Sequence, residues 1–149
     1  MRQLFSFLML FSLVVPAVFA ATTQDVKQLV ETRDKKALST AEILAKAEPK
    51  NAEAWILLTR ARLQSGKTES AIKAGETAVS LAPKNAQTHY WLGNAYGTRI
   101  GQVGMMSKMS LAPKLRDAFE ATIKLDPNNI EARSALVEYY LQAPGFMGG

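Results

Sequence analysis

Large apolar residues recur every three or four positions from Asn51 onward, which is the spacing of one face of an α-helix. This apolar stripe covers residues 52–63 and is interrupted at Gly66. A second stripe covers residues 71–81 and stops before Pro83, whose missing N–H prevents a helix from continuing. The pattern predicts two antiparallel helices joined by a short turn.

This helical hairpin is repeated along the chain. The stretch "PKNAEAW" at Pro49 is followed 34 residues later by "PKNAQTHYW" at Pro83, and "PNNIEA" at Pro127 follows after 44 residues. A single hairpin cannot bury both of its faces, so a fixed period predicts that copies stack on one another. The sequence predicts units at about residues 22–51, 52–85 and 86–129, with a partial unit at 130–149.

The residues at fixed places in these units are similar to those of tetratricopeptide (TPR) repeats. In the unit from Ala52 they are Trp55, Leu58, Thr59, Arg62, Gly66, Ala71, Gly75, Ala78 and Pro83. In the unit from Ala86 they are His89, Leu92, Gly93, Tyr96, Phe119, Thr122 and Pro127. The small residues Ala71, Gly75 and Ala78 would let two helices approach closely. The resemblance covers residues 22–142 and implies an all-α fold, a right-handed superhelix of antiparallel helix pairs.

The resemblance also implies a function, because stacked TPR units form a concave groove lined mainly by the first helix of each pair. The family's groove positions fall on Glu53, Ile56, Arg60, Leu63, Gln64, Gln87, Tyr90, Asn94, Gly97, Thr98, Glu131, Ser134, Glu138, Leu141 and Gln142. Tyr90 has two interpretations, as an apolar anchor for a bound peptide or as packing against the next repeat. Asn94 matches the asparagine of carboxylate-binding TPR domains, but the lysines of that clamp are missing, so capture of a C-terminal carboxylate is not expected.

The ten additional residues of the third unit belong to an insert near residues 97–113. We expect Gly97, Gly101 and Gly104 to space the chain out, and Pro113 to precede the resumed helix. Three hypotheses remain open for this segment. In the first, it is a longer loop or an extended helix whose methionines pack on the repeats. In the second, it contacts a partner or a membrane surface. In the third, it is a soft-metal site for Cu(I). The methionines concerned are Met105, Met106 and Met109.

The first 20 residues have the composition of a secretory signal peptide. Arg2 precedes an apolar stretch over residues 4–15, and small residues lead to a cleavage site at Ala20–Ala21. An uncleaved N-terminal anchor is the alternative. The sequence therefore predicts a periplasmic or secreted bacterial protein with no membrane insertion after cleavage. The chain contains no cysteine, which excludes disulfides, thiolate metal sites and a lipidated cysteine.

The C-terminal unit holds one helix where the pattern calls for two. Leu136, Val137, Tyr140 and Leu141 would then lack a covering helix. Exported bacterial TPR-containing proteins look similar here, with a turn that leads into another helix. We expect a C-terminally truncated chain, with docking on a second protomer or folding back of "GFMGG" as the alternatives.

The residue types argue against chemistry of the protein's own. His89 is the single histidine and takes a core aromatic position, no metal-ligand pair is present, and no cofactor is expected. The net charge of +5 is mild and no basic run alternates with aromatics, so nucleic acid is not expected as a partner. The leading prediction is a non-enzymatic, periplasmic protein-interaction module or scaffold. A methionine-based copper-handling accessory and an architectural subunit of an envelope assembly, using its exposed C-terminal helix, are the alternatives.

Overall fold

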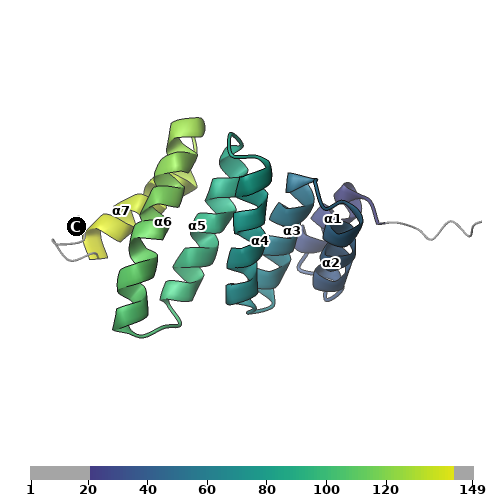
Figure 1. Cartoon of the computed structure of the whole chain (residues 1–149), viewed down its shortest axis with the longest axis horizontal. Helices are drawn as coiled ribbons and strands as arrows, with labels where there is room; N and C mark the ends of the chain where they lie inside the picture. Colours follow the sequence, from purple (N-terminus) through teal and green to yellow (C-terminus); the bar gives the residue numbers. More distant parts are fainter. Residues whose placement is uncertain (1–20, 143–149) are drawn as a thin grey trace, which may run out of the picture.

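The computed structural model describes residues 21–142 of the chain, and they form seven α-helices (Figure 1). The predicted signal peptide, its cleavage site and the C-terminal "GFMGG" lie outside the described residues or at their border. The helices are α1 (Thr23–Glu31), α2 (Ala37–Ala47), α3 (Ala52–Gln64), α4 (Thr68–Leu81), α5 (Ala86–Ile100), α6 (Met105–Leu125) and α7 (Ile130–Gln142). The prediction of an all-α, TPR-like repeat fold is confirmed.

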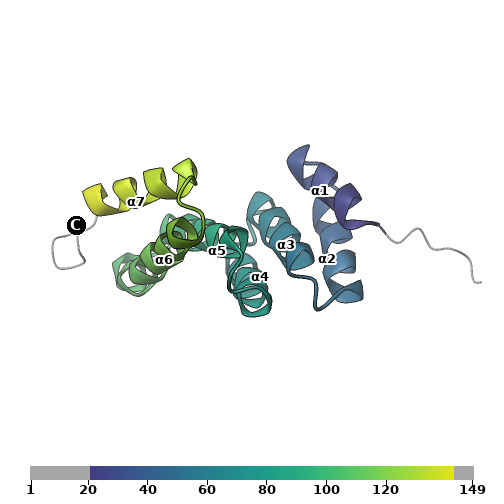
Figure 2. The same ribbon diagram turned by 90° about the horizontal axis from the view of Figure 1, so that it is seen from above.

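The helices follow one another as antiparallel pairs, α1–α2, α3–α4 and α5–α6, with α7 added at the end. Seen from above, they form an arc in which α1, α3, α5 and α7 lie along the inner side and α2, α4 and α6 along the outer side (Figure 2). The inner helix α3 contacts both α1 and α5. The fold therefore presents a curved inner face made of the first helices of the pairs.

Asparagine side chains start three of the helices. The side-chain oxygens of Asn51, Asn85 and Asn129 each accept a hydrogen bond of 2.9–3.0 Å from a backbone N–H in the first helical turn. Such caps satisfy N–H groups that have no partner within the helix. The repeated "P-x-N" of the sequence is thus a stop for one helix followed by a start for the next.

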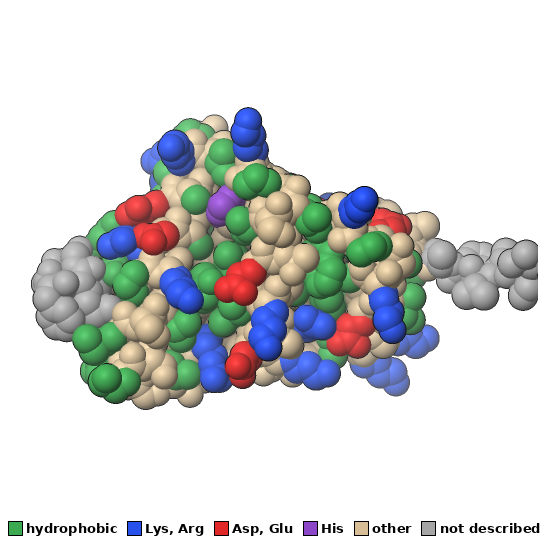
Figure 3. All heavy atoms as spheres, in the orientation of Figure 1, with side chains coloured by type: hydrophobic (Ala, Val, Ile, Leu, Met, Phe, Trp, Pro, Cys, Tyr) green, Lys and Arg blue, Asp and Glu red, His purple; other side chains and the backbone are tan. Residues whose placement is uncertain are grey.

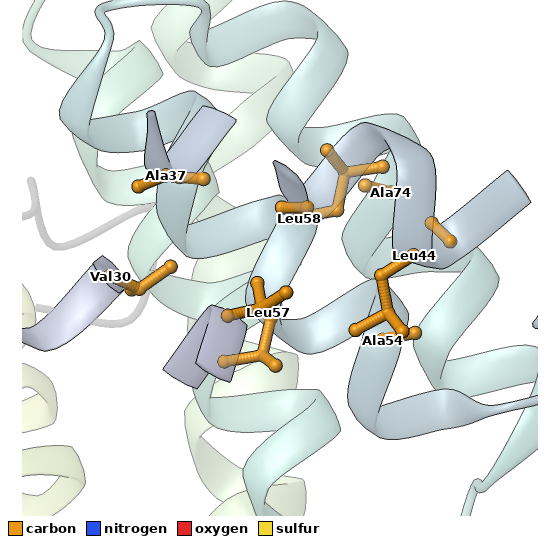
Figure 4. Packing of buried hydrophobic residues seen from close by; sticks show 11 residues of the cluster. Val30, Ala37, Leu44, Ala54, Leu57, Leu58 and Ala74 are labelled. Carbon is orange, nitrogen blue, oxygen red and sulfur yellow. The ribbon is translucent and has the colours of Figure 1, made fainter. Parts of the chain in front are cut away.

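Two clusters of buried side chains hold the helices together. The larger one joins α1 to α4 and includes Val26, Leu44, Leu57 and Ala74 (Figure 4). The smaller one joins α6 and α7 through Phe119, Ala132 and Leu136. The prediction that Leu136 lacks cover is wrong, because this side chain turns inward against Phe119.

Glycines allow close contact between neighbouring helices, within a pair and between pairs. A Cβ atom on Gly75 would lie 3.1 Å from Cδ1 of Leu92, and one on Gly93 would lie 2.8 Å from Cε1 of Phe119. The sequence suggested that Gly75 brings together the two helices of one hairpin. In the structure, Gly75 also allows α4 to approach α5 of the next repeat.

The insert lengthens both helices of the third pair. The expectation that Pro113 precedes a resumed helix is wrong, since α6 begins at Met105 and Pro113 lies inside it. Proline removes one helical hydrogen bond, to the carbonyl four residues earlier. That carbonyl belongs to Met109, whose residue is 44% exposed, so water can bond to it. Met105 and Met106 are 71% and 83% exposed, so these two do not pack on the repeats.

None of the described helices is both long enough and apolar enough to cross a membrane.

Candidate protein-interaction surface

The inner face of the arc carries the residues that the sequence assigned to a groove. They lie on three of its four helices: Glu53, Ile56, Arg60 and Gln64 on α3, Gln87, Tyr90 and Asn94 on α5, and Glu131 and Glu138 on α7. No hydrogen bond or ion pair joins any of these side chains to another within residues 21–142. They are brought onto neighbouring helices rather than into one compact cluster.

Arg60 and Trp91 form the clearest contact on this face. The guanidinium Cζ of Arg60 lies 4.7 Å from the ring centroid of Trp91, which places the cation over the indole. Trp91 in turn meets Tyr90 edge to face, with ring centroids 5.2 Å apart. Arg60, Trp91 and Tyr90 thus form a continuous row from α3 to α5, which we call the Arg60 row.

The charge of Arg60 is not neutralised by any acid among residues 21–142. Its Nε atom is buried and has no hydrogen-bond partner in the described part of the chain. The stack on Trp91 restricts the guanidinium, since cation–π attraction favours one orientation over the ring. The result is a half-buried, oriented cation on the inner face. Sequence reasoning missed Trp91, which stands outside the family's groove positions.

Tyr90 packs against the buried cluster formed by α6 and α7. Its ring is half-buried beside Phe119, at a centroid distance of 6.2 Å, and contacts the cluster that contains Ala132 and Leu136. The geometry gives Tyr90 a packing role, with its ring contact to Phe119 of its own helix pair, while part of the residue stays exposed. The Tyr90 side chain therefore contributes mainly to packing beneath the inner face, and less to the exposed surface.

Three of the predicted groove residues serve the fold. Ile56 is 2% exposed, so its assignment to an open groove is corrected: it packs beneath the surface. The Gln64 amide donates a 2.8 Å hydrogen bond to the Val30 carbonyl, which links α3 to α1. The Asn94 amide donates to the Tyr90 carbonyl of its own helix at 2.8 Å. These side chains shape the inner face without being free to bind.

The remaining predicted residues are available. Gln87, Glu131 and Glu138 are exposed, and Glu53 is half-buried. The Glu138 carboxylate accepts a 3.0 Å hydrogen bond from the Gln142 amide. The inner face thus offers a cation in the middle and two carboxylates on α7.

The same hydrogen bond recurs at the start of α3, α5 and α7, although its donor changes. Trp55 donates to the carbonyl of Pro49 at 2.9 Å, and Nε2 of His89 lies 2.8 Å from the carbonyl of Pro83. Arg133 donates in the same way to the carbonyl of Pro127. Because a carbonyl only accepts, Nε2 of His89 carries the hydrogen. The single histidine therefore has a structural partner.

A second recurring contact joins each inner helix to the outer helix before it. Arg62 pairs with Glu42 at 3.8 Å, the Tyr96 hydroxyl donates to Glu76 at 3.1 Å, and the Tyr140 hydroxyl donates to Glu120 at 2.9 Å. In all three the partners are twenty residues apart. Burial, together with the nearby carboxylate of Glu76, raises the pKa of Tyr96 to about 12. Sequence reasoning missed this contact. The signal for it is a glutamate that stands twenty residues before Arg62, Tyr96 and Tyr140.

Comparison with known proteins identifies the repeat. Residues 60–98 match the model of the TPR repeat, and this stretch includes the end of α3, all of α4 and most of α5. The chain therefore contains a TPR repeat over this stretch. None of the curated proteins compared with it gives a significant match.

Solved structures, two of them of TPR domains, share the fold of this chain at low sequence identity. The TPR domain of Arabidopsis OM64 is 16% identical with a TM-score of 0.68, over 81% of this chain and 93% of that one. MamA is 22% identical with a TM-score of 0.62, over 81% of this chain and 68% of that one. The first TPR domain of human RPAP3 is 17% identical with a TM-score of 0.62, over 81% and 94%. At these identities the likeness concerns the fold.

Metal ligands do not gather in the described part of this TPR protein. Residues 21–142 contain no group of three histidine, cysteine or carboxylate side chains able to hold a metal ion. The copper hypothesis concerns methionines instead, and it stays a prediction. Unchanged Cu(I) affinity after replacing Met105, Met106 and Met109 together would remove it.

Proposed function

We propose that this TPR protein is an exported interaction module that holds a peptide or protein partner on its inner face. TPR domains are protein-interaction modules, and no catalytic family matches the chain. The observation that carries the proposal is the Arg60 row, where a cation without an acidic partner in the described structure is held over Trp91. Aromatic and arginine side chains are the ones that most often dominate binding energy at interfaces.

The charges of the inner face suit a partner segment with both signs of charge. Arg60 on α3 would receive a carboxylate or backbone carbonyls of the segment, because a guanidinium presents several donors in one plane. Glu131 and Glu138 on α7 would favour a basic residue further along it. The module contributes binding and orientation, and carries out no reaction of its own.

Export is part of the proposal. The basic residue Arg2, the apolar stretch at residues 4–15 and the small residues before Ala21 support removal of a signal peptide. The absence of cysteine is compatible with an oxidising compartment, because no thiol is present to mispair. The periplasm or the exterior of a bacterium is the proposed location.

Site-specific photocrosslinking in the native host tests the groove. A photoreactive residue at Gln87, which is exposed on the inner helix α5, should give an adduct with another protein. The same residue at Lys73, exposed on the outer helix α4, is the matched control. Combining the Gln87 probe with Arg60→Glu should weaken the adduct. Adducts from Lys73 alone, or an adduct at Gln87 that Arg60→Glu leaves unchanged, would reject the Arg60 row as the binding surface.

The architectural alternative has one observation in its favour. Ile130, Val137 and Leu141 are 71%, 59% and 81% exposed and lie on one stripe of α7. If this stripe is an interface, sedimentation should show mass increasing with concentration, and Val137→Ser with Leu141→Ser should abolish the increase. A monomeric mass at every concentration would count against the architectural role and leave the groove proposal untouched.

A further inference from the structure

One edge of the molecule is formed by the turns inside the helix pairs. Shallow hollows join these turns. Arg33, Lys35 and Gln64 line the hollow between the α1–α2 and α3–α4 turns. Lys67, Lys73 and Arg99 are among the residues that line the next one, between the α3–α4 and α5–α6 turns. The Thr68 hydroxyl donates a 2.7 Å hydrogen bond to the side-chain oxygen of Gln102 across that second junction. The three turns are therefore continuous along this edge, which we call the turn edge.

The turn edge is basic. Five cations line its two hollows, against the two acids Asp34 and Glu69. Asp34 is already engaged, because its side chain accepts a 2.7 Å hydrogen bond from the backbone N–H of Lys36. None of the five cations forms an ion pair within residues 21–142. Figure 3 shows lysine and arginine side chains gathered along the lower edge of the molecule.

The insert adds an apolar tip to the same edge. Phe119 and Thr122 of α6 take the places that Gly75 and Ala78 take in α4, so Ala112 corresponds to Thr68, the first residue of α4. The helix α6 begins seven residues earlier, which lengthens it by about 10 Å at a rise of about 1.5 Å per residue. Met105 and Met106 occupy this extension and are among the most exposed large apolar residues of the described chain.

We propose that the turn edge docks on the surface of an anionic lipid bilayer, with Met105 and Met106 entering the headgroup region. Basic residues attract an anionic membrane surface, and apolar side chains beside them enter its interface. A nucleic acid or a free anion would satisfy the cations but would offer nothing apolar to the methionines. The combination on one edge therefore favours a membrane surface. Binding of this kind is peripheral and needs no spanning helix.

The direction of the turn edge leaves the inner face free. In Figure 1 the turn edge lies below. In Figure 2, which is turned by 90° and seen from above, the arc opens toward the top of the picture, so its inner face points at a right angle to the turn edge. A molecule docked by its turn edge would still present the Arg60 row to a partner. The inference rests on the turns and the insert alone, so it holds or fails independently of the groove.

Vesicle co-sedimentation of the chain from Ala21 to Gly149 tests the proposal. All seven described helices and both core clusters lie within this piece, and removing residues 1–20 prevents the apolar leader from binding lipid by itself. Binding should be measured to phosphatidylcholine vesicles with and without phosphatidylglycerol. We expect binding only to the anionic vesicles, with loss at about 1 M salt, where the Debye length is about 3 Å.

Matched variants separate the apolar contribution to membrane binding from the electrostatic one. Replacing Met105 and Met106 by serine should reduce partitioning about tenfold or more, because methionine burial contributes in proportion to apolar area. Replacing Lys67 and Arg99 by glutamine should reduce it about fivefold for each charge removed. The control is Ile130→Ser with Leu141→Ser, which removes equally exposed apolar groups from α7 and should change nothing.

A labelling experiment gives a readout that does not depend on affinity. Because the chain has no cysteine, Met106→Cys can carry one environment-sensitive dye, and Ile130→Cys carries the same dye as the control. Anionic vesicles should shift the emission of the dye at position 106 to the blue and leave position 130 unchanged. Equal shifts at both positions, no binding to anionic vesicles, or binding that depends on the cations but not on the methionines would each overturn the proposal.

Discussion

The hydroxyl of Tyr96 on α5 donates a 3.1 Å hydrogen bond to the carboxylate of Glu76 on α4, twenty residues earlier in the chain. The same register joins Tyr140 to Glu120 and Arg62 to Glu42. Each contact ties the first helix of one repeat to the second helix of the repeat before it. Stacking thus depends on polar contacts at a fixed place as well as on buried apolar groups.

Removing the Tyr96 hydroxyl should weaken this junction. We expect Tyr96→Phe to lower the free energy of unfolding by about 1 kcal/mol, the usual net value of one hydrogen bond, because Glu76 is exposed and water can replace its lost donor. Urea unfolding followed by tryptophan fluorescence measures the loss. Tyr140→Phe, whose residue is more exposed, should cost less; a larger loss at Tyr140 would show that burial does not govern these contacts.

The raised pKa of Tyr96 makes stability fall at high pH. Burial and the Glu76 carboxylate raise the pKa to about 12 in the folded chain, whereas an unfolded tyrosine has a pKa of about 10. Below about pH 10 the phenol is neutral in both states and its contribution is fully present. Between about pH 10 and 12 the unfolded state loses the proton first, so the free energy of unfolding decreases.

Unfolding measured at several pH values from 9 to 12, in both the native sequence and Tyr96→Phe, isolates this contribution, since every other titratable group is present in both. The variant should lose less stability across that range. A second variant, Glu76→Gln, should lower the pKa of Tyr96 by removing the carboxylate charge. If the free energy of unfolding fell equally with pH in the native chain and in Tyr96→Phe, the loss of stability would not come from the raised pKa of Tyr96.

Among the glycines of residues 21–142, Gly93 is the one at which an added Cβ would lie closest to a neighbouring atom. A Cβ there would lie 2.8 Å from the ring of Phe119, which is 3% exposed and held in the core. We expect Gly93→Ala to destabilise by about 1–3 kcal/mol through overpacking, despite the gain in helix propensity. Gly97→Ala is the control, because its Cβ would meet only the Cδ1 end of Leu115 at 3.3 Å. Adding Phe119→Leu should recover part of the loss at Gly93, and equal effects at both glycines would refute the role of the ring.

The turn after α1 contains an avoidable strain. Arg33 has a φ of 54°, and the corresponding residue after α3 is Gly66 with a φ of 71°. A left-handed conformation costs a non-glycine residue about 1 kcal/mol. Arg33→Gly should therefore raise the thermal midpoint, while Gly66→Ala should lower it. A destabilising Arg33→Gly would mean that the arginine side chain makes a contribution beyond the turn itself.

Much of the fold was predictable because it depends on local patterns. The asparagine caps, the prolines and the apolar stripes act within one hairpin, and their repetition predicts the stack. Pro113 was misplaced because sequence reasoning treated it as a helix boundary, although a solvent-exposed turn before it tolerates the lost hydrogen bond. Leu136 was misplaced because its cover, Phe119, comes from an earlier helix, and the direction of a side chain on α7 depends on that packing.

The candidate site was less predictable than the fold. Family positions placed Arg60 and Tyr90 on the inner face, but they also placed Ile56 there, which is buried. The contact of Trp91 with Arg60 could be recognised only from the structure, since it depends on the distance between α3 and α5. Contacts between side chains of different helices depend on the angle and spacing of those helices, which a single sequence does not specify.

The stack of Arg60 on Trp91 should be measurable as a coupling between the two residues. Cation–π attraction at a partly exposed site contributes about 0.5–1 kcal/mol. A double-mutant cycle of Arg60→Met and Trp91→Leu, each followed by urea unfolding, should give a coupling energy of that size. Arg60→Lys provides the control for charge, because lysine keeps the cation but not the planar group.

The same cycle connects stability to binding. If Trp91 holds the guanidinium in place for a partner, Trp91→Leu should weaken the crosslink from Gln87 nearly as much as Arg60→Met does, although it leaves the charge of Arg60 intact. Loss of binding in Arg60→Met alone would mean that the charge is sufficient and that its orientation by Trp91 contributes nothing. The distance of 4.7 Å between the Arg60 Cζ and the indole centroid favours the first outcome, since cation–π attraction at this distance favours the guanidinium over the ring.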